Sequence, residues 1–136
     1  MESYLLDTSV IIDYLRGKEQ TLKFVRELFQ RGSGLGCCAV NITEVYAGML
    51  EKERGTTEEF LESLEYYPIS KLAAKEAGEY KRQYAKRGTV LSVPDVTVAA
   101  VAFENRLALI TGNPKHYPMP ELKVIPHGSI SNTTIY

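Results

Sequence analysis

Cysteine is scarce in this sequence, which holds only the adjacent pair Cys37 and Cys38. Neighbouring side chains of an extended strand point to opposite faces, so we do not expect a structural disulfide between them. Two small, reduced core residues are typical of a protein that works in the cytoplasm. The sequence therefore predicts a cytoplasmic location.

The chain also lacks an excess of charge of either sign. It has 16 lysine and arginine residues against 17 aspartate and glutamate residues, which gives a formal net charge of -1 at pH 7. No global positive field is therefore available to attract nucleic acid. Any binding of RNA or DNA has to be local or assisted by a metal ion.

Long hydrophobic runs are missing as well. No apolar stretch approaches the roughly 18 residues that a membrane-spanning helix needs. The first residues include Glu2 and lack a basic segment followed by a long apolar core. We therefore expect neither a membrane partner nor a signal peptide.

The remaining composition is that of an ordinary globular protein. Hydrophobic residues make up 44% of the chain and charged residues 24%. A chain of 136 residues can bury roughly 68–70% of its unfolded surface, which is enough for an independent core. Because no repeat, linker or low-complexity segment interrupts the sequence, we predict one domain over residues 1–136.

Short apolar runs alternate with longer amphipathic stretches. The runs predict strands at residues 4–6, 35–40, 66–69, 107–111 and 123–125. The amphipathic stretches predict helices at residues 10–15, 22–31, 41–50, 60–64, 73–87 and 94–105, with a charged link at 51–57. Strands separated by helices predict a three-layer α/β/α fold with a central, mainly parallel sheet.

Polar residues that can bind a metal follow the predicted strands. Asp7 follows the first strand, and Glu44 follows the second. Asp95 opens the helix before the fourth strand, and Asn113 follows that strand. In a parallel sheet all four lie near the edge where ligands bind. Carboxylates brought together repel, and oxygen ligands without histidine or cysteine favour Mg²⁺ or Mn²⁺.

Each acid also has a purely structural alternative. Asp7 and Asp95 each stand where a side chain can cap the N-terminus of a helix. Asn41 followed by Glu44 three residues later is a capping-box pattern, in which the glutamate satisfies a backbone N–H. The sequence alone leaves both interpretations open for all three acids.

Taken in order, four segments of the chain resemble a PIN domain. They are Leu5–Ile12, Asn41–Gly48, Asp95 with its alanine-rich helix, and Leu109–Asn113. The resemblance covers essentially the whole chain, and the most similar group is the toxin half of VapBC toxin–antitoxin modules. No single segment is specific, but their order and spacing together are.

The resemblance implies a metal-dependent ribonuclease on a Rossmann-like sheet. Asp7, Glu44 and Asp95 fall on the acidic catalytic and metal-binding positions of the family, with Glu44 binding directly or through water. Asn113 stands where the family often has a fourth acid. It can bind an ion through its carbonyl or a water molecule, but it carries no charge. We therefore prefer one tightly bound Mg²⁺ or Mn²⁺, with a second ion brought by the substrate.

Neighbouring hydroxyl groups are expected to orient the metal ligands. The candidates are Thr8, Ser9 and Thr111, and Thr8 or Ser9 is also expected to cap the first helix. No catalytic histidine is needed, so we interpret His116 as a loop residue or phosphate contact. Asp13, one turn into the first helix, is interpreted as a solvated or salt-bridged residue.

RNA needs positive contacts, because the phosphate chain dominates its affinity for proteins. Candidates are Arg16, Lys86, Arg87 and Lys115, although a solvated helix face explains them equally well. The resemblance further implies a VapB-type antitoxin partner, whose C-terminal segment enters the active-site groove, and a homodimer. A PIN nuclease of RNA maturation and a non-catalytic PIN-like scaffold that binds RNA or protein remain the alternatives.

Overall fold

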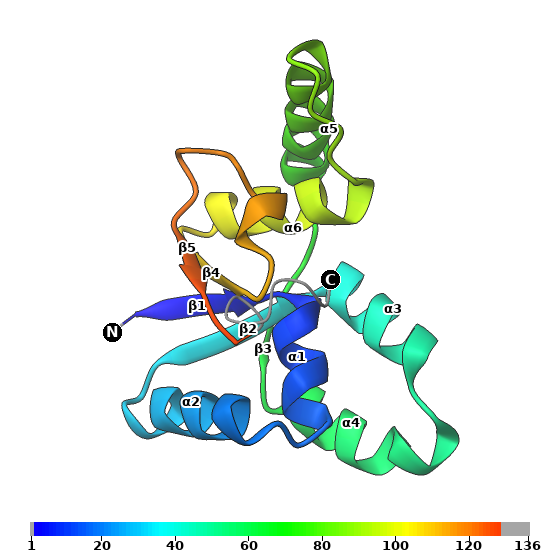
Figure 1. The fold of residues 1–136 in the computed structure, drawn as a ribbon, viewed down its shortest axis with the longest axis vertical. Helices are drawn as coiled ribbons and strands as arrows, with labels where there is room; N and C mark the ends of the chain where they lie inside the picture. The colour runs from blue at the N-terminus through cyan, green and yellow to red at the C-terminus, as the bar shows by residue number, and fades with distance from the viewer. Residues whose placement is uncertain (1, 129–136) are drawn as a thin grey trace.

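A parallel five-stranded sheet forms the centre of the computed structural model, which describes residues 2–128 (Figure 1). The strands are β1 (Ser3–Leu6), β2 (Gly34–Cys38), β3 (Glu65–Tyr67), β4 (Ala108–Thr111) and β5 (Val124–Pro126). Their order in the sheet is β3-β2-β1-β4-β5, and every neighbouring pair is parallel. The predicted parallel sheet is confirmed. The chain moves outward from β1 in both directions, so β1 and β4 flank the switch point where α/β proteins bind ligands.

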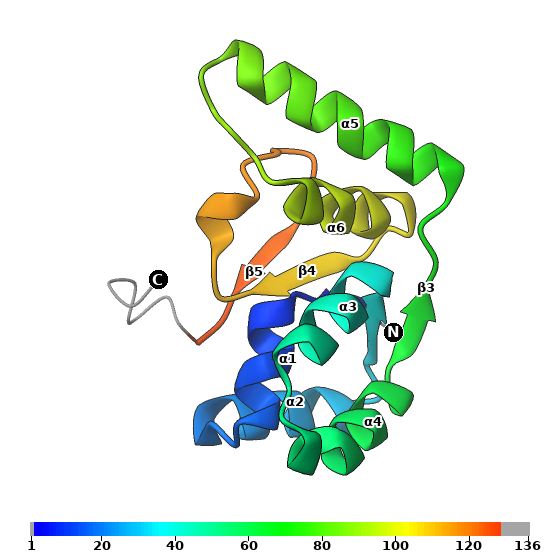
Figure 2. The same ribbon diagram turned by 90° about the vertical axis from the view of Figure 1, so that its right-hand side faces the viewer.

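Helices cover both faces of this sheet (Figure 2). They are α1 (Thr8–Leu15), α2 (Glu19–Gln30), α3 (Ala39–Gly48), α4 (Arg54–Glu62), α5 (Lys71–Lys86) and α6 (Val93–Glu104), with short 3-10 turns η1 (Glu51–Glu53) and η2 (Pro114–His116). None of the helices in the described residues is both long and apolar enough to cross a membrane.

Two hydrophobic cores form because alternate strand residues face opposite sides of the sheet. Leu5 and Leu109 are fully buried against α5 and α6. Leu6 and Ile110, one position further along the same strands, are fully buried against α1, α2 and α4. The three-layer arrangement that the sequence predicts is therefore confirmed.

The two cysteines follow the same alternation. Cys37 belongs to the core beneath α1 and α2, and Cys38 belongs to the core beneath α5 and α6. Both are free thiols, as predicted. Burial raises the pKa of Cys37 to about 11, so this thiol stays protonated at neutral pH.

The start of α3 differs from the prediction. Residues 39 and 40, predicted as the end of a strand, are already helical, and the helix begins two residues before Asn41. The reason is local, because the backbone N–H of Cys38 donates to Asn41 Oδ1 at 2.9 Å and thereby caps the helix.

The predicted link at residues 51–57 is also wrong. It holds η1 and the start of α4. The backbone N–H of Leu50 donates to Glu53 Oε1 at 2.7 Å, and Arg54 Nε lies 2.7 Å from Glu51 Oε2. These local contacts turn a charged stretch into helical structure.

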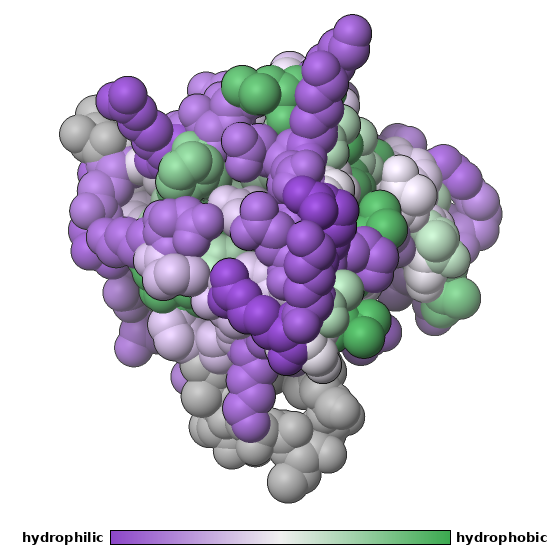
Figure 3. All heavy atoms as spheres, turned by 90° about the horizontal axis from the view of Figure 1, so that it is seen from above, coloured by the Kyte–Doolittle hydropathy of each residue, from purple (hydrophilic) through white to green (hydrophobic). Residues whose placement is uncertain are grey.

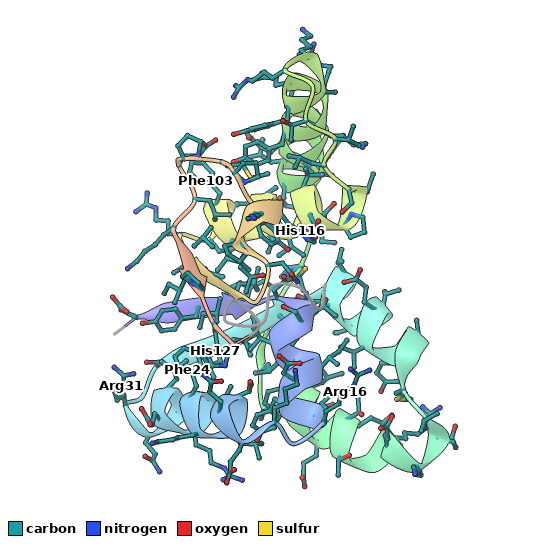
Figure 4. The ribbon with its side chains drawn as sticks, in the orientation of Figure 1. Arg16, Phe24, Arg31, Phe103, His116 and His127 are labelled. Carbon is teal, nitrogen blue, oxygen red and sulfur yellow. The ribbon has the colours of Figure 1, made fainter. Side chains whose placement is uncertain are left out.

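His127 anchors the end of the described chain to the layer of α1 and α2. Its ring stacks on Phe24 with 4.3 Å between ring centroids, and its Nε2 lies 3.1 Å from Thr21 Oγ1 (Figure 4). Asp13 is buried nearby and pairs with Lys18 Nζ at 3.4 Å, so it is salt-bridged and not solvated. His127 is itself buried, and residues 129–136 lie outside the described residues.

His127 should make the stability of the protein depend on pH. Burial lowers the pKa of His127, an effect that the charge of Asp13 opposes. Because the folded pKa is below the unfolded value of about 6.5, the unfolded chain binds more protons as the pH falls through that value. The free energy of unfolding should therefore decrease there, by at most about 1.4 kcal/mol per pH unit.

Urea unfolding between about pH 7.5 and pH 5.5 measures this decrease. The variant His127→Gln keeps a polar group near Thr21 and does not titrate, so its stability should change less over this range. An equally steep loss in the variant would show that other groups control the effect.

Candidate active site

Asp7 lies at the point where β1 passes into α1. It is the N-cap of α1, and its Oδ1 accepts from the backbone N–H of Thr8 at 2.9 Å. The capping alternative is thus correct for Asp7, and the expectation that Thr8 or Ser9 caps this helix is wrong. The other oxygen, Oδ2, accepts from Thr111 Oγ1 at 2.7 Å. This contact ties Asp7 to the end of β4.

Asp95 lies in the first turn of α6 and does not cap it. Ser92 is the N-cap, and its Oγ accepts from the backbone N–H of Asp95 at 3.2 Å. The carboxylate of Asp95 is therefore left available to the edge of the sheet. Its Oδ2 lies 3.4 Å from Nδ1 of His116, which places this histidine of η2 beside an acid and not in an isolated loop (Figure 4).

Tyr117 joins the two aspartates. Its hydroxyl oxygen lies 3.0 Å from Asp7 Oδ1 and 3.2 Å from Asp95 Oδ1. The side chain is only 3% exposed and comes from the loop that follows η2. Nothing in the sequence pointed to Tyr117 as a residue of this site. A tyrosine in a loop rich in proline and charge carries no periodic signal, and only its burial reveals the role of its hydroxyl.

Glu44 reaches the same edge through Thr8. Glu44 Oε1 accepts from Thr8 Oγ1 at 2.6 Å, and Thr8 Oγ1 in turn accepts from Asn41 Nδ2 at 3.0 Å. Asn41 is fully buried. Because Asn41 already caps α3 through Cys38, the capping-box alternative for Glu44 is wrong, and its carboxylate lies beside the start of α1.

Ser9, Thr111 and Asn113 take part in hydrogen bonds that hold the backbone after β4. Ser9 Oγ accepts from the N–H of Gly112 at 3.1 Å. Thr111 Oγ1 accepts from the N–H of Asn113 at 2.9 Å, while its own proton goes to Asp7. Asn113 is therefore adjacent to the acids, and its backbone supports Thr111.

Burial dominates the electrostatics of this cluster. It raises the pKa of Asp7, and the nearby charge of Asp95 adds to the rise, while hydrogen bonds from Thr111, Tyr117 and Thr8 oppose it. Burial also raises the pKa of Tyr117, so its hydroxyl remains a proton donor. Two neighbouring carboxylates in such surroundings favour a bound cation.

The donor chemistry fits a hard cation, but the three acids do not meet at one point. Within residues 2–128, no three Asp, Glu, His or Cys side chains are grouped closely enough to hold one ion. Asp7 and Asp95 both contact the Tyr117 hydroxyl. Glu44 instead contacts the hydroxyl of Thr8, the residue after Asp7. Carboxylate oxygens are the donors that hard cations such as Mg²⁺ or Mn²⁺ prefer.

The predicted RNA contacts are spread over the molecule. Lys115 lies in η2 immediately before His116, whose Nδ1 is 3.4 Å from Asp95 Oδ2. Arg16 caps the other end of α1 from Asp7, and Lys86 and Arg87 lie at the end of α5, beyond α6 (Figure 2). The end of the molecule where α5 projects has a mostly hydrophilic surface with separate hydrophobic areas (Figure 3).

Thr8 should hold Glu44 in place, which the variant Thr8→Val tests. Valine keeps the shape of threonine but removes the hydroxyl, so Glu44 loses its donor and the buried amide of Asn41 loses its acceptor. We expect a loss of about 1–3 kcal/mol in the free energy of unfolding, measured with urea. Thr56→Val is the control, because the Thr56 hydroxyl bonds only a local, exposed carbonyl. Equal losses in the two variants would contradict the proposed connection.

The sequence and the fold both match known proteins. Residues 4–122 match the family model of the PIN domain. Ribonuclease VapC10 of Mycobacterium tuberculosis is 30% identical over 117 residues, which cover 86% of this chain and 87% of the relative. Ribonuclease VapC19 of the same organism is 28% identical over 120 residues, which cover 88% of this chain and 96% of the relative.

Solved structures agree in fold. A DNA-bound VapBC2 complex from Rickettsia felis contains a chain that matches with a TM-score of 0.81 and 17% identity, over 93% of this chain and 99% of that chain. A chain of DNA-bound VapBC from Salmonella typhimurium matches with a TM-score of 0.79 and 22% identity, over 93% of this chain and 98% of that chain. The expected family is therefore confirmed: this chain belongs to the PIN domain family and is of the VapC type.

Proposed function

We propose that this protein is a metal-dependent endoribonuclease, the toxin of a type II toxin–antitoxin pair, and that residues 1–136 act as one nuclease domain. The observation that carries the proposal is the pairing of Asp7 and Asp95 around one hydroxyl, with Glu44 attached through Thr8. Membership of the PIN domain family and relatives named ribonuclease VapC support it.

Asp7 and Asp95 are the proposed catalytic residues that hold Mg²⁺ or Mn²⁺. Glu44 completes the set through water, and Asn113 is a further candidate through its carbonyl or a water molecule. The ion, when bound, lowers the pKa of a coordinated water and neutralises charge on the phosphate. Substrate brings a second ion in the version that we favour, because Asn113 carries no charge.

The surrounding side chains keep the proposed ligands in place. Thr111 and the N–H of Thr8 fix both oxygens of Asp7, so its carboxylate cannot rotate freely. Ser9 holds the backbone of Gly112, which keeps the loop after β4 against α1. Lys115 belongs to this same segment after β4 and is the proposed contact for an RNA phosphate.

A basic antitoxin is the partner that this site suits. The matched solved structures are VapBC complexes, and the cognate partner proposed here is a VapB-type antitoxin. A lysine or arginine of the antitoxin placed among the acids would supply the charge that Asp7 and Asp95 need. We further propose a homodimer that acts in the cytoplasm, where its RNA substrates are found.

Cleavage of a mixed RNA pool by the purified protein, freed of any partner, tests the nuclease activity. Wild type should cut with Mg²⁺ or Mn²⁺ and not with EDTA. Asp7→Asn and Asp95→Asn should each cut at least about 100-fold more slowly, because each removes a charged ligand while keeping its shape. Asp13→Asn is the matched control, since Asp13 is also buried on α1 but pairs with Lys18.

Cleavage that survives EDTA, or an Asp7→Asn variant as active as Asp13→Asn, would contradict the proposal. Absence of cleavage by folded wild type would favour a scaffold that binds RNA without cutting it. Induced expression in a bacterium separates a toxin from a nuclease of RNA maturation. The wild type should arrest growth, and Asp7→Asn should relieve the arrest.

A further inference from the structure

The hydroxyl of Tyr117 occupies an unusual position in this site. It is the one group that contacts both Asp7 and Asp95 among the residues that the structure describes, at 3.0 Å and 3.2 Å. A phenol has a single proton, whereas an ionised carboxylate can only accept hydrogen bonds. The hydroxyl therefore shares one proton between two acceptors that would otherwise repel each other.

The aromatic ring of Tyr117 contributes to core packing, which is separate from the contacts of its hydroxyl. It packs in the hydrophobic core beneath α5 and α6, together with Tyr84 and Met119. Phenylalanine would fill this space equally well, so core packing explains the ring and not the hydroxyl. Nearby, Tyr84 satisfies its own hydroxyl with the backbone carbonyl of Pro118 at 3.2 Å, which shows that a local carbonyl acceptor is available.

The second oxygen of each carboxylate has a partner of its own, so Tyr117 is the group that connects the two aspartates. Asp7 Oδ2 is held by Thr111, and Asp95 Oδ2 lies beside His116. Only the two Oδ1 atoms share a partner, and that partner is Tyr117. This hydroxyl therefore links the two carboxylates directly, although Asp7 precedes α1 and Asp95 lies in the first turn of α6.

We propose that Tyr117 is a positioning residue, whose hydroxyl holds Asp7 and Asp95 at the separation needed to bind one divalent cation. This inference rests on the proposed function, because it assumes that the two aspartates are the ligands. It adds a residue that acts on the metal through its ligands and not on the RNA. Without the hydroxyl, Asp7 is still held by Thr8 and Thr111, but Asp95 Oδ1 loses its bond to Tyr117. The Asp95 carboxylate is then free to turn away from Asp7, and the two ligands are no longer held together before an ion binds.

The test is the affinity for Mn²⁺, measured by titration calorimetry on the purified, partner-free protein. Tyr117→Phe removes only the hydroxyl, and we expect it to bind Mn²⁺ about 10-fold more weakly than wild type, as for other groups that orient metal ligands. Tyr84→Phe is the matched control, because it removes a buried hydroxyl from the same core. It should bind Mn²⁺ as wild type does.

Restoring RNA cleavage with extra Mn²⁺ distinguishes a residue that positions the metal ligands from one that only stabilises the fold. RNA cleavage by Tyr117→Phe should rise toward the wild-type rate as the Mn²⁺ concentration is raised, since the ligands themselves are intact. Thermal unfolding of Tyr117→Phe and Tyr84→Phe measures how far each variant is destabilised. We expect the two losses of stability to be similar.

The results distinguish this inference from the proposed function. If wild type binds Mn²⁺ and Tyr117→Phe binds it equally well or more tightly, the role of Tyr117 is wrong and the metal site stands. If wild type itself binds no Mn²⁺, the proposed metal site is wrong, and the role of Tyr117 is overturned with it.

Discussion

Burying a carboxylate is costly unless hydrogen bonds or a cation compensate it, and the edge of this sheet depends on that constraint. Asp7 is only 7% exposed, and hydrogen bonds from Thr8, Thr111 and Tyr117 compensate part of the cost. Asp95, which lies on the other side of Tyr117, adds a second negative charge. The hydrogen bonds orient the two carboxylates, but they do not neutralise them, so the site favours a divalent cation or a basic partner.

Parallel strands bring these groups together from distant parts of the chain. Asp7 follows β1, and Thr111 ends β4, whose register pairs Leu6 with Ile110. The N–H of Asp7 donates to the carbonyl of Ile110 at 2.9 Å, which fixes the two strand ends against each other. Asp7 and Asp95 also lie at the N-termini of α1 and α6, where the helix dipole stabilises negative charge.

Helix capping and ligand binding turn out to be compatible in this fold. One carboxylate oxygen of Asp7 caps α1, while the other is bound by a residue of β4. At the other two helices a different residue is the cap, Ser92 for α6 and Cys38 with Asn41 for α3. The choice between structural and functional interpretations, which the sequence left open, is thus resolved separately at each helix.

Much of this arrangement could be predicted from the sequence, because strand and helix patterns determine where each acid lies. The parallel sheet, the placement of Asp7 and Asp95 at its edge and the opposite faces of the cysteines all follow from periodicity. Tyr117 could not be predicted in this way, since residues 112–120 have no periodic pattern and only tertiary packing buries the ring. The link from Glu44 to Thr8 likewise depends on the approach of α3 to α1, which local sequence does not encode.

The anomalous scattering of Mn²⁺ in soaked crystals would show whether Asp7 and Asp95 hold the ion. We predict a peak bounded by the carboxylates of Asp7 and Asp95, with Glu44 reaching it through water. Asp7→Asn crystals soaked in the same way should show a much weaker peak. A peak elsewhere in the wild type, or none between these two acids at saturating Mn²⁺, would show that Asp7 and Asp95 are not the metal ligands.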